Sequence, residues 1–167
     1  PQGQIMAGRT GVRATLASFL TTPQIVTLNQ VFTSFPKRIN FQVNSVAGQL
    51  SRAAVVVFIQ SENETRLAIG GATNGWKRVD YSIVLQIFHH SLHRNAEDAM
   101  TDFDTLVDNI KTRLRSDHRF GDSTGTLVWQ GAEPIINATY GEPQTVAEGA
   151  TETYAELQFD VTEMIQA

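Results

Sequence analysis

Three closely spaced histidines are the group in this chain whose residue types best match a metal site. His89, His90 and His93 precede Glu97 and Asp98, and imidazoles and carboxylates both bind zinc. Zinc needs three or four ligands that converge at about 2 Å. On a strand His89 and His90 would point to opposite faces, whereas on a helix only His89 and His93 would share a face. We therefore interpret the histidines as solvated turn residues and predict no metal and no cofactor.

Two further segments contain residue types used in catalysis or phosphate binding. Ser116, Asp117 and His118 are the three types of a hydrolase triad, but a triad is assembled in space and adjacent residues rarely reach its geometry. Residues 121–125, Gly-Asp-Ser-Thr-Gly, have the composition of a phosphate-binding loop, yet no lysine follows them and we expect no helix after them. We predict a surface loop here, and we predict that the chain is not an enzyme.

A strand followed by a helix is the clearest structural unit of the sequence. Trp76–Phe88 alternates in the manner of a long strand, His89–Arg94 is a polar turn, and Asn95–Arg115 has the period of an amphipathic helix. Asn95 is a suitable N-cap, with acidic residues in the first turn and basic residues in the last turns. The expected buried face comprises Ala99, Phe103, Leu106, Val107, Ile110 and Leu114. We interpret the acidic residues Asp98, Asp102, Asp104 and Asp108 as the solvated side of this helix.

The N-terminal half predicts a second helix and several strands. A helix from Thr10, its expected N-cap, to Ser18 or Leu20 ends before Pro23, and residues 1–8 are expected to form a flexible arm. The other expectations are a strand at Leu28–Phe35, an ambiguous linker at Phe41–Gln49, a strand buried on both faces at Ala53–Gln60, a turn at Ser61–Glu64, a returning partner strand at Thr65–Ile69 and a turn at Asn74–Gly75.

The C-terminal third predicts short strands between loops. Leu127–Gln130 and Ile135–Tyr140 are strand fragments, and Arg119–Gly125 and Gly141–Thr151 are loops. In Tyr154–Val161, apolar and polar residues alternate, which is typical of a sheet with one wet face or of an edge strand. We predict one α+β domain over residues 9–167, with two main helices packed on a mostly antiparallel or mixed sheet.

Composition limits the class of protein. The 167 residues are 41% hydrophobic and 18% charged, and no apolar run is long enough for a membrane helix. Without cysteine, neither disulfides nor thiolate metal sites can form. The beginning of the sequence has no signal-peptide pattern, so we expect a soluble, intracellular protein without membrane contact.

Charge divides the sequence into two unequal halves. Residues 1–80 carry eight Lys/Arg and three Asp/Glu, whereas residues 81–167 carry five Lys/Arg and fourteen Asp/Glu. These charges either coat one common surface or form a basic and an acidic edge suited to head-to-tail association in a ring. The net charge of −4 argues against a nucleic-acid-binding protein.

Several segments, taken in order, resemble a family of phage proteins. Phe32–Pro36, Thr65–Gly71, Arg78–Leu85, Leu114–Asp117 and Val128–Trp129, together with chain length and the order of elements, resemble the tail-terminator (tail-completion) proteins of long-tailed bacteriophages. The likeness spans roughly residues 9–165, and no single residue is diagnostic of it.

The resemblance implies a structural virion protein rather than a catalyst. Members of the family form a hexameric ring that caps the tail tube, ends its polymerisation and presents a surface to head-completion or connector proteins. For this chain it implies a homohexamer located in the virion tail or neck and assembled in the host cytoplasm, through which DNA passes without specific binding.

We expect particular residues to make these contacts. Arg66, Arg78 and Trp76 are the predicted subunit interface, placed at strand ends. Loops on a rigid scaffold commonly carry recognition, so the predicted partner-docking residues are Arg119, Phe120, Asp122, Glu142 and Glu148.

Three alternatives remain open from the sequence. The chain could be a tail-tube or head–tail connector subunit, a small metal-dependent hydrolase that uses the histidines, or a general α+β module that binds a peptide or protein.

Overall fold

The alternating residues after Gly75 form the central strand of a mixed seven-stranded sheet. A computed structural model describes residues 8–42, 44, 46–67, 75–122, 126–146 and 149–166. In chain order the elements are α1 (Arg9–Thr21), β1 (Leu28–Phe32), β2 (Ser51–Arg66), β3 (Trp76–Ser91), α2 (Ala96–Ser116), β4 (Leu127–Trp129), β5 (Asn137–Tyr140), β6 (Gln144–Thr145) and β7 (Thr151–Gln166).

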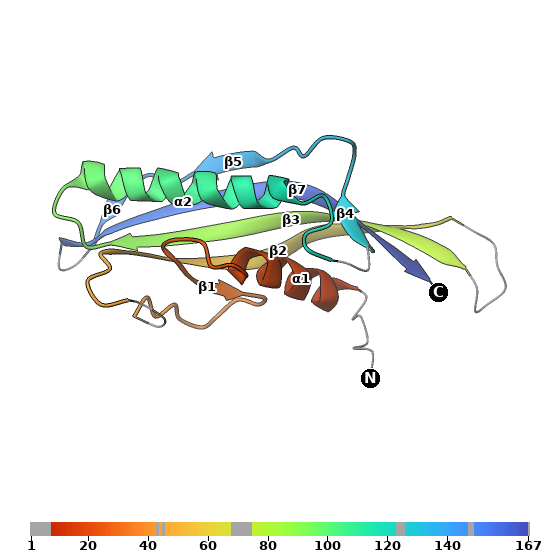
Figure 1. The fold of residues 1–167 in the computed structure, drawn as a ribbon, viewed down its shortest axis with the longest axis horizontal. Helices are drawn as coiled ribbons and strands as arrows, with labels where there is room; N and C mark the ends of the chain where they lie inside the picture. The colour runs from red at the N-terminus through yellow and green to blue at the C-terminus, as the bar shows by residue number, and fades with distance from the viewer. Residues whose placement is uncertain are drawn as a thin grey trace.

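Three strands of 16 residues each, β2, β3 and β7, form the body of the sheet. The strand order is β1-β2-β3-β7-β4, with β1 parallel to β2 and the other pairs antiparallel. The short strands β6, β5 and β4 follow one another along the outer edge of β7. The result is an elongated sheet in which β3 lies between the two other long strands (Figure 1).

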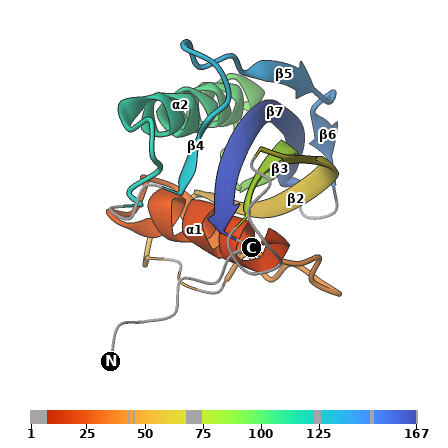
Figure 2. The same cartoon turned by 90° about the vertical axis from the view of Figure 1, so that its right-hand side faces the viewer.

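Both helices lie on the same side of the sheet (Figure 2). From α1, Val12, Leu16 and Leu20 are buried against the sheet. The buried residues of α2 are Ala99, Phe103, Leu106, Val107, Ile110 and Leu114, which are the face predicted from the sequence. Among the described residues, no helix is both long and apolar enough to cross a membrane.

The other face of the sheet is covered only in part. The segment between β1 and β2 crosses it, with Phe35 against Phe58 and the ring of Phe41 stacked on His90. The remaining side chains of this face include several polar residues of β7, such as Gln158 and Asp160, which are exposed. The last strand therefore has the wet face that its alternation predicts.

The predicted fold class is confirmed, since the chain is one compact α+β domain with two helices on a mixed sheet. The two helices lie where the sequence places them, and the last strand, predicted at Tyr154–Val161, extends over Thr151–Gln166. The caps differ in part from the prediction. Gly8, and not Thr10, is at the N-cap of α1. Asn95 occupies the N-cap position of α2 as predicted, but its side chain donates to Asp98 and makes no capping hydrogen bond.

The predicted turn at Ser61–Glu64 is wrong, and so is the partner strand at Thr65–Ile69. β2 passes a bulge between Ile59 and Ser61 and continues to Arg66, paired with β3 throughout. Ser-Glu-Asn-Glu has the composition of a turn, but it equally suits a strand in water on both sides. Pairing with an equally long β3 decides between the two. Asn74 of the predicted turn and the first seven residues of the predicted arm are outside the described residues.

Candidate functional site

A hairpin arm extends beyond the part of the sheet that the helices cover. We define it as residues 60–66 of β2 with Leu67, together with Gly75 and residues 76–80 of β3. Every β2 side chain from Gln60 to Arg66 is exposed, whereas Ser51–Val57 are all buried. The arm projects past α1 and β4 at one end of the molecule (Figure 1). Its β2 strand is too solvated to serve as core, which makes that strand a surface available to a partner.

One edge of β2 is unpaired along the arm. β1 pairs with β2 only as far as Val56, opposite Phe32. From Val57 to Arg66, this edge has no strand neighbour within the described residues. An unpaired edge offers a row of backbone N–H and C=O groups to a strand of another chain.

Two of the three predicted interface residues are exposed on the arm, and the third is paired. Arg66 is exposed and lies opposite Lys77, which forms a 2.9 Å ion pair with Glu64. Trp76 is 44% exposed, an unusual state for tryptophan. The Nε of Arg78 donates to Asp80 at 2.9 Å, so this guanidinium already has a carboxylate on its own strand.

The base of the arm contains a buried carboxyl group. Glu163 is only 4% exposed, and its Oε1 accepts the backbone N–H of Gly8 at 2.9 Å. Burial, aided by the charge of Asp122, raises the pKa of Glu163. Burial and the charge of Glu163 also raise the pKa of Tyr81 to about 12. The contact with Gly8 ties the start of α1 to the strand beside the arm.

Phe120 is wrongly predicted as a docking residue. Its ring is 1% exposed and packs among Phe19, Trp129 and Phe159. Asp117 accepts the backbone N–H groups of Arg119 and Gly121, and this turn directs the Phe120 side chain inward at a φ of 54°. The aromatic residue therefore belongs to the core.

The other predicted docking residues differ in their surroundings. Arg119 and Glu142 are exposed, and Asp122 accepts a hydrogen bond from Thr126 at 3.2 Å. Glu148 is outside the described residues.

The histidines do not form one cluster, and the prediction of a solvated turn is wrong for His89. β3 continues to Ser91, so His89 points to the helix side and His90 to the other face. His89 is 1% exposed and packs against Phe103. Burial lowers the pKa of His89 to about 4. Within the described residues, no three His, Cys, Asp or Glu side chains are placed to hold a metal ion.

His93 takes part in a hydrogen-bond network at the start of α2. Asp102 Oδ2 lies 2.7 Å from His93 Nε2 and accepts the Ser51 hydroxyl at 2.6 Å. Burial alone would raise the pKa of Asp102, but hydrogen bonds from Ser51 and His93 outweigh it and lower the pKa. The carboxylate, not the imidazole, contacts the serine, so the network lacks the Ser–His bond that activates a nucleophile.

The two remaining catalytic patterns also lack their structural context. Ser116 donates its hydroxyl to the backbone carbonyl of Arg113, and His118 is exposed. Residues 121–125 match Gly-x-Ser-x-Gly as well, but a nucleophile elbow connects a strand to a helix. Here the segment lies between the end of α2 and β4, and residues 123–125 are outside the described part.

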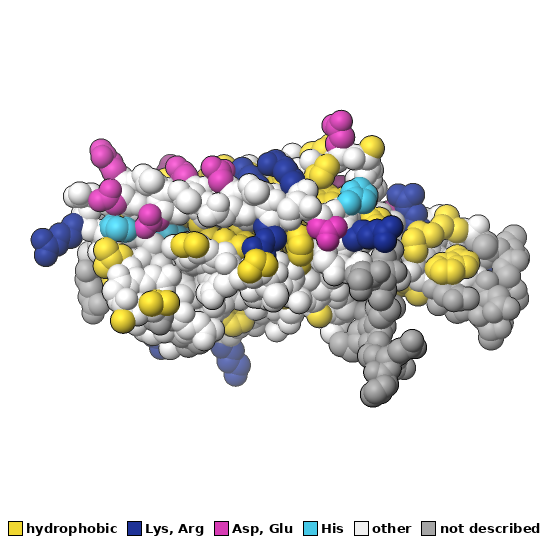
Figure 3. Space-filling view, viewed as in Figure 1, with side chains coloured by type: hydrophobic (Ala, Val, Ile, Leu, Met, Phe, Trp, Pro, Cys, Tyr) yellow, Lys and Arg dark blue, Asp and Glu magenta, His cyan; other side chains and the backbone are white. Residues whose placement is uncertain are grey.

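The two sequence halves lie on different sides of the central strand, although their charges do not follow this division strictly, since β1 has no charged residue and β2 carries two arginines and two glutamates. β1 and β2, from the basic half, lie on one side of β3, while β7 and its three short neighbours, from the acidic half, lie on the other. Acidic side chains also line the outer surface of α2 (Figure 3). The two halves are thus separated across the sheet rather than mixed.

No protein-family model matches the chain, and no curated protein matches it.

The arm is the feature that the sequence analysis missed. The sequence indicates the arm only indirectly. The long alternating strand that begins at Trp76 needs a partner strand of equal length, and the residues before Leu67 are the nearest segment that could pair with it. Trp76 and Arg66, which the sequence predicts at a subunit interface, are both exposed at its end.

Proposed function

We propose that the chain is a structural subunit of a phage tail that assembles into a ring, caps the tail tube and ends its polymerisation. The observation that carries this proposal is the hairpin arm, a two-stranded extension that is solvated along β2 and unpaired on one edge. Such an extension costs backbone entropy and adds little core beyond Val79. Contact with another chain would offset that cost. The resemblance to tail terminators supports the same conclusion.

The subunit contact in this proposal is head-to-tail. When two different surfaces of identical chains bind each other, each subunit is rotated by a fixed angle relative to the last. If these rotations add up to a full turn the subunits form a closed ring, and otherwise they form an open filament. The hairpin arm at one end of the sheet and the acidic second half of the chain on the other side of β3 are two different surfaces, as such a contact requires. The partners of the ring are the tail-tube protein on one side and a head-completion protein on the other, and DNA passes through without specific binding.

Charge reversal on the arm tests the assembly. We expect Arg66→Glu with Arg78→Glu to abolish rings that the unaltered protein forms, as measured by native mass spectrometry and electron microscopy. The matched control reverses two exposed basic residues elsewhere, Arg94→Glu with Arg115→Glu, and retains the rings. Intact rings in the arm variant would remove the arm from the interface.

The same images separate the terminator from its nearest alternative. Discrete closed rings are expected of a terminator, whereas a tube subunit polymerises into filaments. Filaments of the purified protein would overturn the terminator function and favour the tube subunit.

A further inference from the structure

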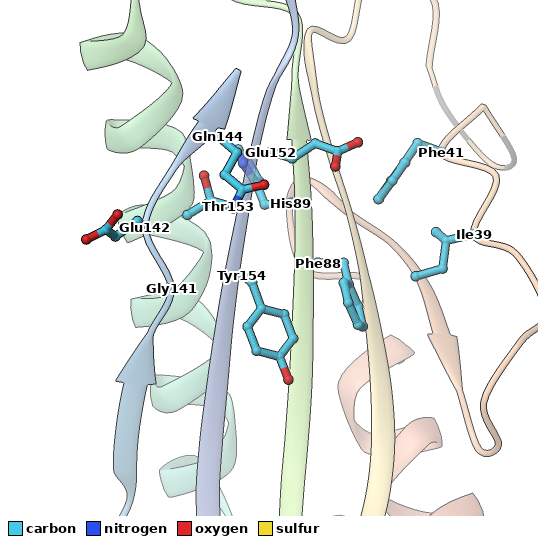
Figure 4. Close-up of a pocket in the computed structure, with 10 residues that line it drawn as sticks. All are labelled: Ile39, Phe41, Phe88, His89, Gly141, Glu142, Gln144, Glu152, Thr153 and Tyr154. Atoms are coloured by element: carbon cyan, nitrogen blue, oxygen red, sulfur yellow. The ribbon is translucent and has the colours of Figure 1, made fainter. Parts of the chain in front are cut away.

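A hollow lined by acidic and aromatic residues lies at the opposite end of the sheet from the arm. It has a volume of about 500 Å³ and opens on the face that the helices leave uncovered. β3 and β7 form its floor, the segment after β1 forms one wall and the connection between β5 and β6 forms the other (Figure 4). Its lining includes the aromatic residues Phe41, Phe88 and Tyr154 and the carboxylates of Glu142 and Glu152.

Aromatic rings provide much of its surface. Phe88 and Tyr154 lie side by side on neighbouring strands, with ring centroids 5.1 Å apart. Phe41 forms the facing wall, and its ring stacks on His90 at 5.1 Å and an interplanar angle of 14°. The Tyr154 hydroxyl donates to Glu156, so its polar end is already satisfied and the ring itself faces the hollow. Rings arranged in this way attract a flat or compact cation.

Two carboxylates supply the negative charge. Glu152 extends from β7 toward Phe41, with Oε1 3.3 Å from His90 Nδ1 (Figure 4). Glu142 lies on the opposite rim and is exposed. Arg38 lies in the adjoining hollow beyond Phe41, and the buried Arg52 of β2 is paired across the strands with His90. A carboxylate beside aromatic faces suits a guanidinium group, which can stack and donate at the same time.

The wall at Gly141 is held close to the floor. The Gly141 N–H donates to the carbonyl of Tyr154 at 2.8 Å, and a Cβ at this position would lie 3.4 Å from that carbonyl oxygen and 3.5 Å from the Tyr154 Cβ. Glycine thus lets the connection between β5 and β6 run directly against the strand. The hollow is therefore bounded by fixed contacts on this side.

We propose that this hollow receives the hairpin arm of a second copy of the chain, with Arg66 as the cation that enters it. This inference rests on the proposed ring assembly and specifies the contact between neighbouring subunits. Arg66 is exposed, and the described residues contain no ion pair to it. Leu67 and Trp76, 51% and 44% exposed, flank it and match the apolar walls.

The positions of the two surfaces give the contact its direction. Phe88 in the hollow and Lys77 in the arm belong to the same strand, β3. At about 3.3 Å per residue, the hollow and the arm are therefore roughly 35 Å apart. An arm cannot enter the hollow of its own chain across that distance along a continuous sheet. Each copy then offers an arm at one end and a hollow at the other, as a head-to-tail contact requires.

A charge exchange tests the pairing of Arg66 with Glu152. We expect Arg66→Glu and Glu152→Arg each to weaken self-association by at least about tenfold, because each places like charges together. The double variant is expected to recover most of the association, and sedimentation velocity measures all three. Equal weakening in the single and double variants would overturn the pairing.

Disulfide trapping gives an independent readout, since the natural chain has no cysteine. Leu67→Cys with Gln144→Cys places one thiol on the arm and one at the rim while keeping Arg66 and Glu152. Mild oxidation is expected to give a ladder of covalent multimers. The control Leu67→Cys with Asp108→Cys, whose second thiol is on the exposed side of α2, is expected to give none.

The outcomes separate this inference from the proposed function. Rings that give no ladder and tolerate Glu152→Arg would overturn the contact and leave the terminator function standing. Open filaments that give the ladder would support the contact and overturn the terminator function. A chain that stays monomeric at about 100 µM and gives no ladder would overturn the contact.

Discussion

His89 is held neutral by its surroundings. Its two ring nitrogens are buried, and neither has a hydrogen-bond partner among the described residues. Burial is the main reason that the pKa falls to about 4, and the attraction of Asp102 only partly opposes it. In the unfolded chain an imidazole titrates near 6.5. Between these two values the unfolded state binds more protons than the folded state.

Stability is therefore expected to fall as the pH is lowered from about 6.5 to 4. The shift of His89 corresponds to a loss of about 3 kcal/mol in the free energy of unfolding by pH 4. His89→Phe should remove most of this slope, because phenylalanine has no proton to bind. Urea unfolding at several pH values measures the effect.

The control for this prediction is His118→Asn, which changes an exposed histidine and should retain the slope. An unchanged pH dependence in His89→Phe would show that other groups cause the acid sensitivity.

At the scale of elements, α2 is fixed to the sheet through a carboxylate as well as through its apolar face. Asp102 connects the first half of the helix to Ser51 at the start of β2 and to His93 in the turn after β3. Ser51 and Ser91 are themselves 3.1 Å apart across the two strands. The network therefore determines how the helix begins above the strand ends.

Asp102→Ala is expected to destabilise the fold by about 1–3 kcal/mol, because it removes the carboxylate that accepts the buried Ser51 hydroxyl and contacts His93, and leaves Ser51 only the hydroxyl of Ser91 as a partner. Thermal and urea unfolding measure the change. Asp104→Ala is the matched control on the exposed side of the same helix, with an expected effect within about 0.5 kcal/mol. Equal effects in the two variants would contradict the role of the network.

The elements differ in how well the sequence predicts them. The buried face of α2 could be read directly, because its apolar residues have the helical period and the helix buries one face against a sheet. The outer half of β2 could not, because Ser61–Glu64 has the composition of a turn and only its long-range pairing with β3 makes it a strand.

The candidate sites also differ in how far the sequence predicts them, depending on whether their residues are neighbours in the sequence or only in the fold. Trp76 and Arg66 could be selected as exposed residue types at strand ends. The hollow could not be predicted, because Phe41, Phe88 and Tyr154 come from three segments that are adjacent only in the folded sheet. The burial of Phe120 could not be predicted either, because a glycine-rich neighbourhood does not indicate the side to which a single ring turns.

For the whole molecule, the charge distribution predicts how it treats nucleic acid. The net charge is −4, and acidic residues dominate the second half of the chain. A subunit of this kind repels the phosphate backbone, as a channel that lets DNA slide must do. We expect no measurable affinity for duplex DNA at about 150 mM salt by fluorescence anisotropy. Tight binding under these conditions would contradict the ring proposal.

The position of β7 determines when the fold can be completed. Among the described strands, β7 is the one that pairs with four others, namely β3, β4, β5 and β6. Glu163 within β7 also accepts the N–H of Gly8, from the far end of the described chain. Until residues 151–166 leave the ribosome, one full edge of β3 and all three short strands lack their partner. Native structure then forms late and through contacts distant in sequence, which slows folding and exposes a long β edge to aggregation.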